Sequence, residues 1–416
     1  MREMKDSGIE WVGDIPQDWQ LSKIGSLYTQ RNEKVSDKDY QPLSVTMQGI
    51  LPQLATAAKT DDGDNRKLVR VGDFAINSRS DRRGSCGISP LDGSVSLINI
   101  ILTPRTAMHP GYYNWLFHTT LFADEFYKWG HGIVADLWTT RWQEMKSITV
   151  PVPEYAEQER IAAFLDAECA EIDAVLEKTR ASIEEYKKLK QAVITQAVTK
   201  GIRGDRPMKD SGIEWIGAIQ KDWGSNTIAQ LCSQVKCKNT GLQEKNLLSL
   251  SYGKVKRKSI DTVEGLLPES FDGYNIIEKD DIVLRLTDLQ NDHTSLRVGL
   301  AEERGIITSA YLTIRNRSNM CTKYLYYYLH SFDIAKGFYG MGAGVRQGLN
   351  WDGVKWLKVL VPSVSEQEHI VAFLDAESEK LDALIAKKQQ YLSEIENYKK
   401  SLIYEYVTGK KEVHPL

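Results

Sequence analysis

Two polar loops, each placed after a short apolar strand, contain the residue types that hydrogen-bond to the edges of DNA bases. The strands are predicted at 74–76 and 282–284. Arginine pairs with guanine, asparagine and glutamine pair with adenine, and aspartate accepts from cytosine. The alternative is that each is an ordinary solvated loop. On the first reading, base contacts are expected from Asn77, Ser78, Arg79, Arg82, Arg83, Arg285, Thr287, Asp288, Gln290, Asn291 and Arg297.

A second pair of loops, rich in glycine, covers residues 129–136 and 339–347. Glycines let backbone N–H groups approach phosphate closely, and the loops also carry His131, Arg346 and Gln347, which we add to the expected DNA contacts. The run of glycines lacks the strand, GxGxxG and helix context of a dinucleotide site. Plain turn chemistry is the alternative here.

No arrangement of residues predicts catalysis, so we expect no enzyme activity in this chain. There is no GxxxxGK[ST] phosphate loop, no motif resembling Asn-Pro-Pro-Tyr, and no HExxH among the seven histidines. Five cysteines are scattered, and the closest two, Cys232 and Cys237, have poor spacing for zinc, so neither a metal nor a bound cofactor is expected.

The composition, 42% hydrophobic and 26% charged over 416 residues, predicts a soluble globular protein of two or three domains. No apolar run opens the chain and no stretch is long enough to span a bilayer, so we expect a cytoplasmic protein without a membrane partner. The net charge is −3, but residues 20–150 carry 15 basic and 13 acidic side chains, and residues 224–360 carry 18 and 14. DNA binding needs a positive face, which these two blocks can provide.

An internal repeat is the strongest signal in the sequence. MKDSGIEWVGDIPQDW at 4–19 returns as MKDSGIEWIGAIQKDW at 208–223, with 12 of 16 positions identical. EQERIAAFLDAE at 157–168 returns as EQEHIVAFLDAE at 366–377, with 10 of 12 identical. Between these motifs lie two divergent inserts of mixed α/β character. The repeat therefore predicts two similar halves related by a pseudo-two-fold axis, as in a fused homodimer.

Each EQE motif opens a segment with the apolar spacing of a coiled-coil helix. Thr179 and Lys190 interrupt the first stripe, and Lys388 and Lys399 interrupt the second at equivalent places. These polar positions either control the register of the pair or are lysine stems at the edge of the seam. The expected seam consists of Leu165, Ile172, Leu176, Ile183, Tyr186, Val193, Leu374, Leu381, Ile385, Leu392, Ile395 and Leu402.

A lone amphipathic helix of this length would be unstable, so the two helices are expected to pair antiparallel. Gly201 and Gly409 stand where each should stop. At 1.5 Å per residue, about 44 residues make a rod of roughly 65 Å. Such a rod is long enough to place two heads on successive turns of one face of B-DNA, which repeats about every 34 Å.

These features together resemble the specificity (S) subunits of Type I restriction-modification systems, over essentially the whole chain. The resemblance rests on the duplicated MKDSGIEW motif, the duplicated EQE-x-I-x-AFLDAE helix, and Lys200-Gly201 at the helix end. It implies an α+β chain with two target recognition domains, each of which reads half of a split double-stranded DNA site. The implied segments are recognition domains at 1–153 and 204–362 and helical spacers at 154–203 and 363–416.

The resemblance also implies partners that carry the chemistry. Two methyltransferase (M) subunits would bring S-adenosylmethionine, and restriction (R) subunits would bring ATP- and Mg-dependent cleavage. The length of the helices would set the spacer between the half-sites. The competing interpretations are a protein-interaction scaffold with paired helices, a recognition subunit of another DNA-modifying effector, and an enzyme with fused recognition domains, for which the chain is too short.

Overall fold

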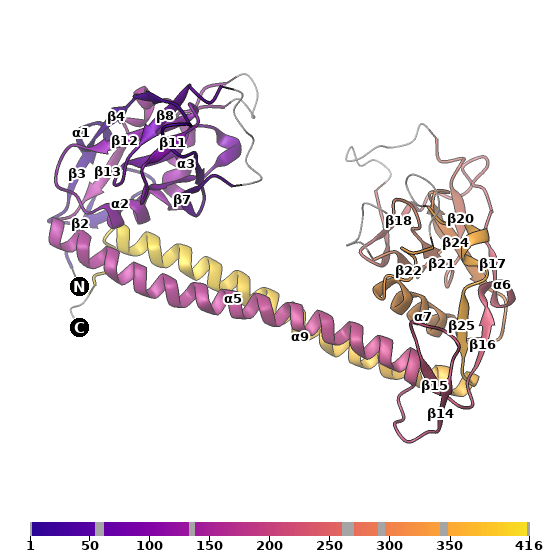
Figure 1. Cartoon of the computed structure of the whole chain (residues 1–416). Coiled ribbons are helices and arrows are strands. Elements are labelled where there is room, and N and C mark those ends of the chain that lie inside the picture. The colour runs from indigo at the N-terminus through magenta and orange to yellow at the C-terminus, as the bar shows by residue number, and fades with distance from the viewer. Residues whose placement is uncertain are drawn as a thin grey trace. The chain divides into compact units, whose positions relative to one another are not determined.

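The computed structural model describes residues 2–54, 62–132, 138–259, 270–289, 296–341 and 348–413. The chain forms two compact units, which do not follow the order of the sequence. Unit 1 combines Met1–Arg180 with Gln390–Leu416, and unit 2 is Ala181–Gln389. Each long helix therefore begins in one unit and ends in the other, so each unit contains the first part of one helix and the last part of the other (Figure 1).

Unit 1 is built on a four-stranded antiparallel sheet in the order β10-β9-β12-β4, beside a three-stranded sheet β11-β8-β5. Smaller pairs are β1-β2, β3-β13 and β6-β7. Its elements are β1 Met4–Asp6, β2 Asp14–Pro16, β3 Gln20–Lys23, α1 Ile24–Leu27, β4 Tyr28–Arg31, β5 Lys34–Val35, β6 Leu43–Thr46, β7 Gly49–Pro52, β8 Arg66–Val69, β9 Phe74–Asn77, η1 Ser80–Arg82, β10 Cys86–Ile88, β11 Gly93–Val95, β12 Asn99–Pro104, α2 Pro110–Phe117, α3 Thr120–Lys128, α4 Trp142–Met145, β13 Thr149–Val152 and the start of α5 Tyr155–Lys200.

Unit 2 repeats this plan with the four-stranded sheet β17-β24-β21-β22 and the pairs β14-β15, β16-β25, β18-β19 and β20-β23. Its elements are β14 Met208–Asp210, β15 Ala218–Gln220, β16 Gly224–Thr227, α6 Ile228–Leu231, β17 Cys232–Gln234, β18 Leu248–Ser251, β19 Lys254–Arg257, β20 Asn275–Ile277, β21 Ile282–Leu284, β22 Val298–Leu300, β23 Gly305–Ile307, β24 Leu312–Asn316, α7 Thr322–Ile334, α8 Trp351–Val354, β25 Lys358–Val361 and the start of α9 Val364–Val407. The predicted strands at 74–76 and 282–284 are the buried strands β9 and β21.

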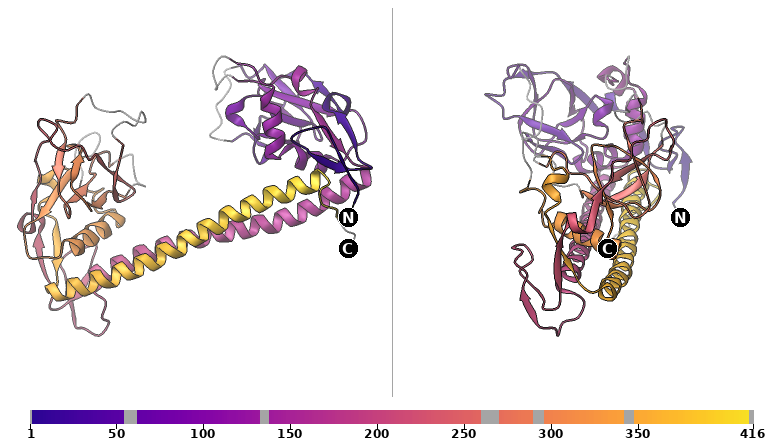
Figure 2. Two further views of the ribbon diagram at one scale, coloured as in Figure 1. Left: turned by 180° about the vertical axis from the view of Figure 1, so that it is seen from behind. Right: turned by 90° about the vertical axis from the view of Figure 1, so that its right-hand side faces the viewer.

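Helices α5 and α9 pair antiparallel in both units, as the sequence predicts (Figure 2). In unit 1 the rings of Phe164 and Tyr406 lie 4.4 Å apart, and in unit 2 Lys190 contacts Asp382. Half of the expected seam residues are fully buried and half are partly buried. The buried ones are Leu165, Leu176, Ile183, Leu374, Leu381 and Leu402; the partly buried ones are Ile172, Tyr186, Val193, Ile385, Leu392 and Ile395.

The polar interruptions of the seam connect the two helices. Lys190 donates to Asp382, and its repeat counterpart Lys399 donates to Asp173 at 2.6 Å. The ammonium of Lys388 lies 5.7 Å from the ring centroid of Tyr186. Thr179, in contrast, donates to the carbonyl of Val175 within its own helix. The lysines therefore make contacts across the pair, which favours control of register over stems at the edge of the seam.

The end of each long helix contacts a short β-hairpin, β1–β2 for α9 in unit 1 and β14–β15 for α5 in unit 2. Gly201 and Gly409 follow α5 and α9 with φ of 80° and 73°, which confirms the predicted stops. A Cβ on Gly409 would lie 2.4 Å from Pro16, and one on Gly201 would lie 2.2 Å from the side chain of Gln220. Glycine is required here both by the left-handed backbone and by the close approach of the hairpin. Figure 1 shows the last turns of α9 beside β2 and α2.

Gln220, which stands in place of Pro16 in the second repeat, has a role of its own. Its Nε2 donates to the carbonyl of Lys200 at 2.8 Å. This carbonyl lies at the end of α5 and lacks a partner within the helix, and proline has no side-chain N–H that could donate to it. In both units a tyrosine also donates a hydrogen bond to a carbonyl at the end of the long helix; it belongs to α2 in unit 1 and to α7 in unit 2. Tyr112 donates to Val407 at 2.8 Å, and Tyr324 donates to Val198 at 3.2 Å.

Candidate nucleic-acid interface

The two expected contact loops of unit 1 lie side by side, joined by residues 138–140. Thr139 exchanges both backbone hydrogen bonds with His131, and Ser80 N donates to the carbonyl of Trp138 at 3.0 Å. Thr140 N in turn donates to the carbonyl of Ser78 at 3.0 Å. The polar loop after β9 therefore lies next to the described ends of the glycine-rich segment, at His131 and at residues 138–140.

The first two residues of the polar loop support it from inside. Asn77 and Ser78 are buried, contrary to the expectation that both contact bases. The Ser78 hydroxyl donates to the carbonyl of Ile98, and the Tyr127 hydroxyl donates to the carbonyl of Asn77 at 2.8 Å. These bonds fix the point at which the loop leaves the sheet, so the two residues position the arginines that follow.

The three arginines of this loop reach the surface. Arg79 and Arg82 both approach Asp81, with N–O distances of 3.5 and 3.7 Å. Arg83 is exposed, pairs with Asp124, and lies with its guanidinium 6.0 Å from the ring centroid of Tyr127. Exposed pairs of this kind are weak in water, so a phosphate or a base can replace the carboxylates at little cost.

Beside Arg79, the surface is hollowed into a depression of about 400 Å³. It is lined by Ser78 and Arg79 of the polar loop and by residues that the sequence did not single out, among them Lys67 and Arg141. Lys67 Nζ donates to the carbonyl of Asn99 at 2.6 Å, and burial lowers the pKa of this amine. His131 is exposed, with Nε2 3.8 Å from Glu144. The depression therefore brings several basic groups together with the ring of Trp142.

Unit 2 repeats the junction of the two loops. Leu349 N donates to the carbonyl of Leu286 at 2.8 Å, at the positions that correspond to Thr140 and Ser78 in unit 1. Thr287 is exposed, and Arg285 and Asp288 are partly exposed. The backbone of Asp288 has a φ of 55°, a left-handed conformation that aspartate tolerates better than most side chains. The remaining expected contacts, Gln290, Asn291, Arg346 and Gln347, lie outside the described residues.

Arg297 was expected to contact bases, and its placement contradicts this. The residue is 0% exposed. Its Nε donates to the Tyr339 hydroxyl at 3.1 Å, and the guanidinium lies 5.0 Å from that ring. It also donates to three backbone carbonyls of its own loop, those of Arg285, Thr287 and Asp288. The carbonyl of Arg285 corresponds to that of Asn77 in unit 1. Arg297 therefore donates to the same position of the loop as the Tyr127 hydroxyl does in unit 1.

A β-hairpin next to the polar loop in each unit was missed by the sequence analysis. In unit 1, the tip of β6–β7 carries Met47, which is 71% exposed and packs near Gly84. In unit 2, the tip of β18–β19 carries Tyr252, which is 85% exposed with a φ of 48°. A Cβ on the adjoining Gly253 would lie 3.1 Å from Leu296, so this tip is seated against the start of β22.

Only the hairpin of unit 2 is strongly basic. Strand β19 begins the run Lys254-Val255-Lys256-Arg257-Lys258, whereas β7 of unit 1 reads Gly-Ile-Leu-Pro. Lys254 and Lys256 are exposed and, being two residues apart on a strand, point to the same face. Four basic residues in five positions was the signal that could have identified this segment.

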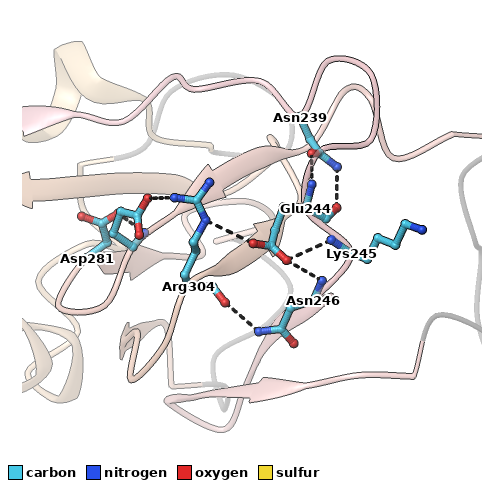
Figure 3. A network of polar contacts seen from close by, with 7 residues as sticks. Asn239, Glu244, Lys245, Asn246, Asp281 and Arg304 are labelled. Atoms are coloured by element: carbon cyan, nitrogen blue, oxygen red, sulfur yellow. Dashed lines mark hydrogen bonds and ion pairs between the residues drawn. The ribbon is translucent and has the colours of Figure 1, made fainter.

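A network of polar contacts fixes the base of this hairpin (Figure 3). Arg304 donates to Glu244 at 3.1 Å and to Glu278 at 2.5 Å, and Asn246 Nδ2 donates to the carbonyl of Arg304. Asn239 and Glu244 exchange hydrogen bonds within the same turn. Hydrogen bonds from the backbone of Asn246, together with Arg304, lower the pKa of Glu244. Because β18 begins two residues after Asn246, the network orients the strand that leads to Tyr252.

Among the residues that the structure describes, no group of three His, Cys, Asp or Glu side chains is arranged to hold a metal ion. In the same part of the chain, no helix is long and apolar enough to cross a bilayer.

Comparison with known proteins rests on structure alone. No family profile matches the chain, and no curated protein does. A chain from a structure on complex assembly and conformational transition of the type I R-M system matches with a TM-score of 0.70 and 13% identity, covering 95% of this chain and 99% of that chain. The HsdS subunit from Thermoanaerobacter tengcongensis matches at 0.49 and 15%, covering 95% and 98%. The S subunit of a Type-I restriction-modification system from M. genitalium matches at 0.37 and 15%, covering 94% and 96%.

The first of these likenesses shows that the chain has the fold of a type I R-M component over nearly its whole length. The expected fold class, mixed helices and strands with two long antiparallel helices, is thereby confirmed.

Proposed function

We propose that this chain is the specificity subunit of a Type I restriction-modification complex and reads a split double-stranded DNA site, one half with each unit. The observation that carries the proposal is the matched surface of the two units. In each, a polar loop and a loop before a short helix meet through the same backbone hydrogen bond, Thr140 N to Ser78 O and Leu349 N to Leu286 O, and a hairpin tip lies next to the polar loop. Two similar frames with different side chains suit the reading of two different sequences.

Within this interface, the exposed side chains contact DNA and the buried ones hold the loops. In unit 1 the contacts come from Arg79, Arg82, Arg83 and His131, with Lys67 and Arg141 beside the depression. In unit 2 they come from Arg285, Thr287 and Asp288 and from the hairpin residues Tyr252, Lys254 and Lys256. Gln290, Asn291, Arg346 and Gln347 remain predictions from the sequence. The lysines hold phosphates, which fix register without reading sequence.

The chain itself performs no chemistry in this proposal. Two methyltransferase subunits dock on it and bring S-adenosylmethionine, and restriction subunits bring ATP- and Mg-dependent cleavage, in the cytoplasm.

Helices α5 and α9 set the spacer between the half-sites. Lengthening both helices by equal amounts is expected to change the spacer and leave the half-site sequences as they are. Altered half-site sequences in such a variant would contradict this role of the helices.

Methylation mapping tests the proposal directly. The chain is expressed with the methyltransferase subunit of its own system in a host that lacks other modification, and the DNA is sequenced for modified bases. The expected result is a split motif, two short specific halves around a fixed unspecified spacer. A stable complex that produces no new methylation would instead favour a scaffold, or a recognition subunit for another effector.

A further inference from the structure

A groove of about 430 Å³ lies in unit 2 where the end of α5, the start of α9 and the start of β14 meet. We call it the α5–α9 groove. Its lining includes Val193, Ala197, Ile202, Arg203, Met208 and Phe373. Every one of these residues belongs to unit 2, so the groove is formed within a single compact body.

The groove gathers apolar side chains that are not covered by the chain. Ile202, Met208 and Phe373 are 37%, 45% and 39% exposed, and all three line it. Single exposed apolar residues are common on protein surfaces, but a group that shares one concave surface marks a contact site for another molecule. Arg203 is exposed in the same lining and adds a positive charge.

Unit 1 shows what fits such a groove. The repeat relates Phe373 to Phe164 and Ala197 to Tyr406, each pair being 209 positions apart. In unit 1 the rings of Tyr406 and Phe164 lie 4.4 Å apart, tilted by 40°. An aromatic side chain of this chain therefore packs against the phenylalanine of unit 1, whereas the methyl group of Ala197 leaves the ring of Phe373 partly exposed. The α5–α9 groove of unit 2 is lined by Ala197 and Phe373, the counterparts of the two residues whose rings meet in unit 1.

We propose that the α5–α9 groove receives an aromatic side chain of a methyltransferase subunit, with a carboxylate of that subunit next to Arg203; this rests on the function proposed above. Because unit 1 fills the corresponding place with Tyr406, only unit 2 offers this contact. The two methyltransferase subunits consequently bind to non-equivalent ends of the chain, and one of them binds more tightly than the other.

The full-length chain offers a direct test in the variant Ala197→Tyr, which places in unit 2 the side chain that unit 1 already carries. Val175→Tyr, at an exposed position of the same helix in unit 1, is the matched control. Binding of the purified methyltransferase subunit is measured by titration, and the stoichiometry by sedimentation. Wild type and Val175→Tyr are expected to bind two copies. Ala197→Tyr is expected to weaken one of the two binding steps at least tenfold and to leave the other unchanged.

A second variant, Arg203→Glu, guards against a folding defect, because it reverses an exposed charge of the lining and leaves the apolar residues of the groove unchanged. It is expected to weaken the same binding step. Unchanged affinity at both steps in both variants would overturn the proposal and leave the proposed function standing. A wild-type chain that binds no methyltransferase would overturn both. Self-association of the wild-type chain that Ala197→Tyr abolishes would assign the groove to a second copy and overturn the proposed partner.

Discussion

Lys190 of α5 and Asp382 of α9 form an ion pair with a nitrogen–oxygen distance of 2.7 Å, and the repeat places Lys399 and Asp173 in the same relationship at 2.6 Å. Each pair joins the two helices within one unit. Polar contacts at matched depths of an apolar seam select one register, because any shift of one helix would leave the charges unpaired. The helix pair is therefore fixed at two places by the same chemistry.

Reversing one charge should weaken the helix pair, and reversing both should restore it. Asp382→Lys places two positive charges together and is expected to cost about 1 kcal/mol, since the pair is only partly buried. Lys190→Asp combined with Asp382→Lys should recover most of that loss. Urea unfolding of the two single variants and the double variant measures the coupling. A coupling energy of zero in this cycle would show that the pair does not stabilise the two helices against each other.

Arg297→Ala should destabilise unit 2 rather than only alter its DNA preference. The change removes the charged donor to the partly buried carbonyls of Arg285, Thr287 and Asp288, and a hydrogen bond to a charged group contributes about 1.5–3 kcal/mol. We expect a loss of about 3 kcal/mol or more in the free energy of unfolding. Arg285→Ala, at a partly exposed position, should cost less than about 1 kcal/mol. Similar stabilities of the two variants would refute the supporting role of Arg297.

Tyr252 allows DNA binding and stability to be separated at one position. Tyrosine is strained at a φ of 48°, and asparagine tolerates this conformation better. Tyr252→Asn should therefore keep or slightly raise thermal stability, while it removes the ring from the tip of the basic hairpin. We expect about tenfold weaker DNA binding by the complex, with the effect confined to the half-site of unit 2. Met47→Ala, the control at the hairpin of unit 1, should leave binding to the half-site of unit 2 unaffected.

The sequence predicted the helix pair well because its apolar period depends only on local spacing. Leu165 and Leu374 are buried in the seam as expected, and Gly201 ends its helix. Strands β9 and β21 lie where the sequence predicted them, but in the loops that follow them the buried and the exposed residues were not told apart. Arg297 is buried because Tyr339, 42 residues later, meets it, and no local pattern reveals such a contact.

Charge gave a similarly partial picture. The basic run that begins at Lys254 was visible in the sequence, but its meaning depends on the hairpin that places it beside the polar loop. The position of Arg141 at the depression of unit 1 likewise depends on the junction made by Thr139. Tertiary contacts between segments far apart in the chain, rather than residue type, decide which polar side chains face a partner.

Acid should destabilise unit 2 through His330 of α7. Burial, and to a smaller extent the charge of Lys190, lowers the pKa of His330 to about 4, against 6.5 for an unperturbed histidine. As the pH falls, the histidine of the unfolded chain takes up a proton before that of the folded chain. The free energy of unfolding is therefore unaffected by His330 above pH 6.5 and decreases as the pH falls from 6.5 toward 4. The loss is on the order of 3 kcal/mol at the lower end.

His330→Gln removes the titrating group and provides the measurement for this prediction. Free energies of unfolding at pH 7.5 and pH 5 should differ less in the variant than in the wild type. Burial also lowers the pKa of His118, the counterpart in unit 1, so His118→Gln is expected to act in the same direction. An equal dependence on pH in wild type and His330→Gln would place the acid sensitivity elsewhere.

Gly409→Ala should be far more damaging than a substitution at another glycine with nearly the same backbone. Gly409 and Gly8 have φ of 73° and 66°, so alanine meets a similar backbone penalty of about 1–2 kcal/mol at both. At Gly8 nothing lies within 4 Å of the added Cβ, whereas at Gly409 the Cβ would lie 2.4 Å from Pro16 and 3.0 Å from Trp19. The clash adds about 1–3 kcal/mol to the cost, because the β1–β2 hairpin must move away from the end of α9. Thermal unfolding of both variants measures the difference, and equal midpoints would mean that the hairpin yields at no cost and does not hold the helix end.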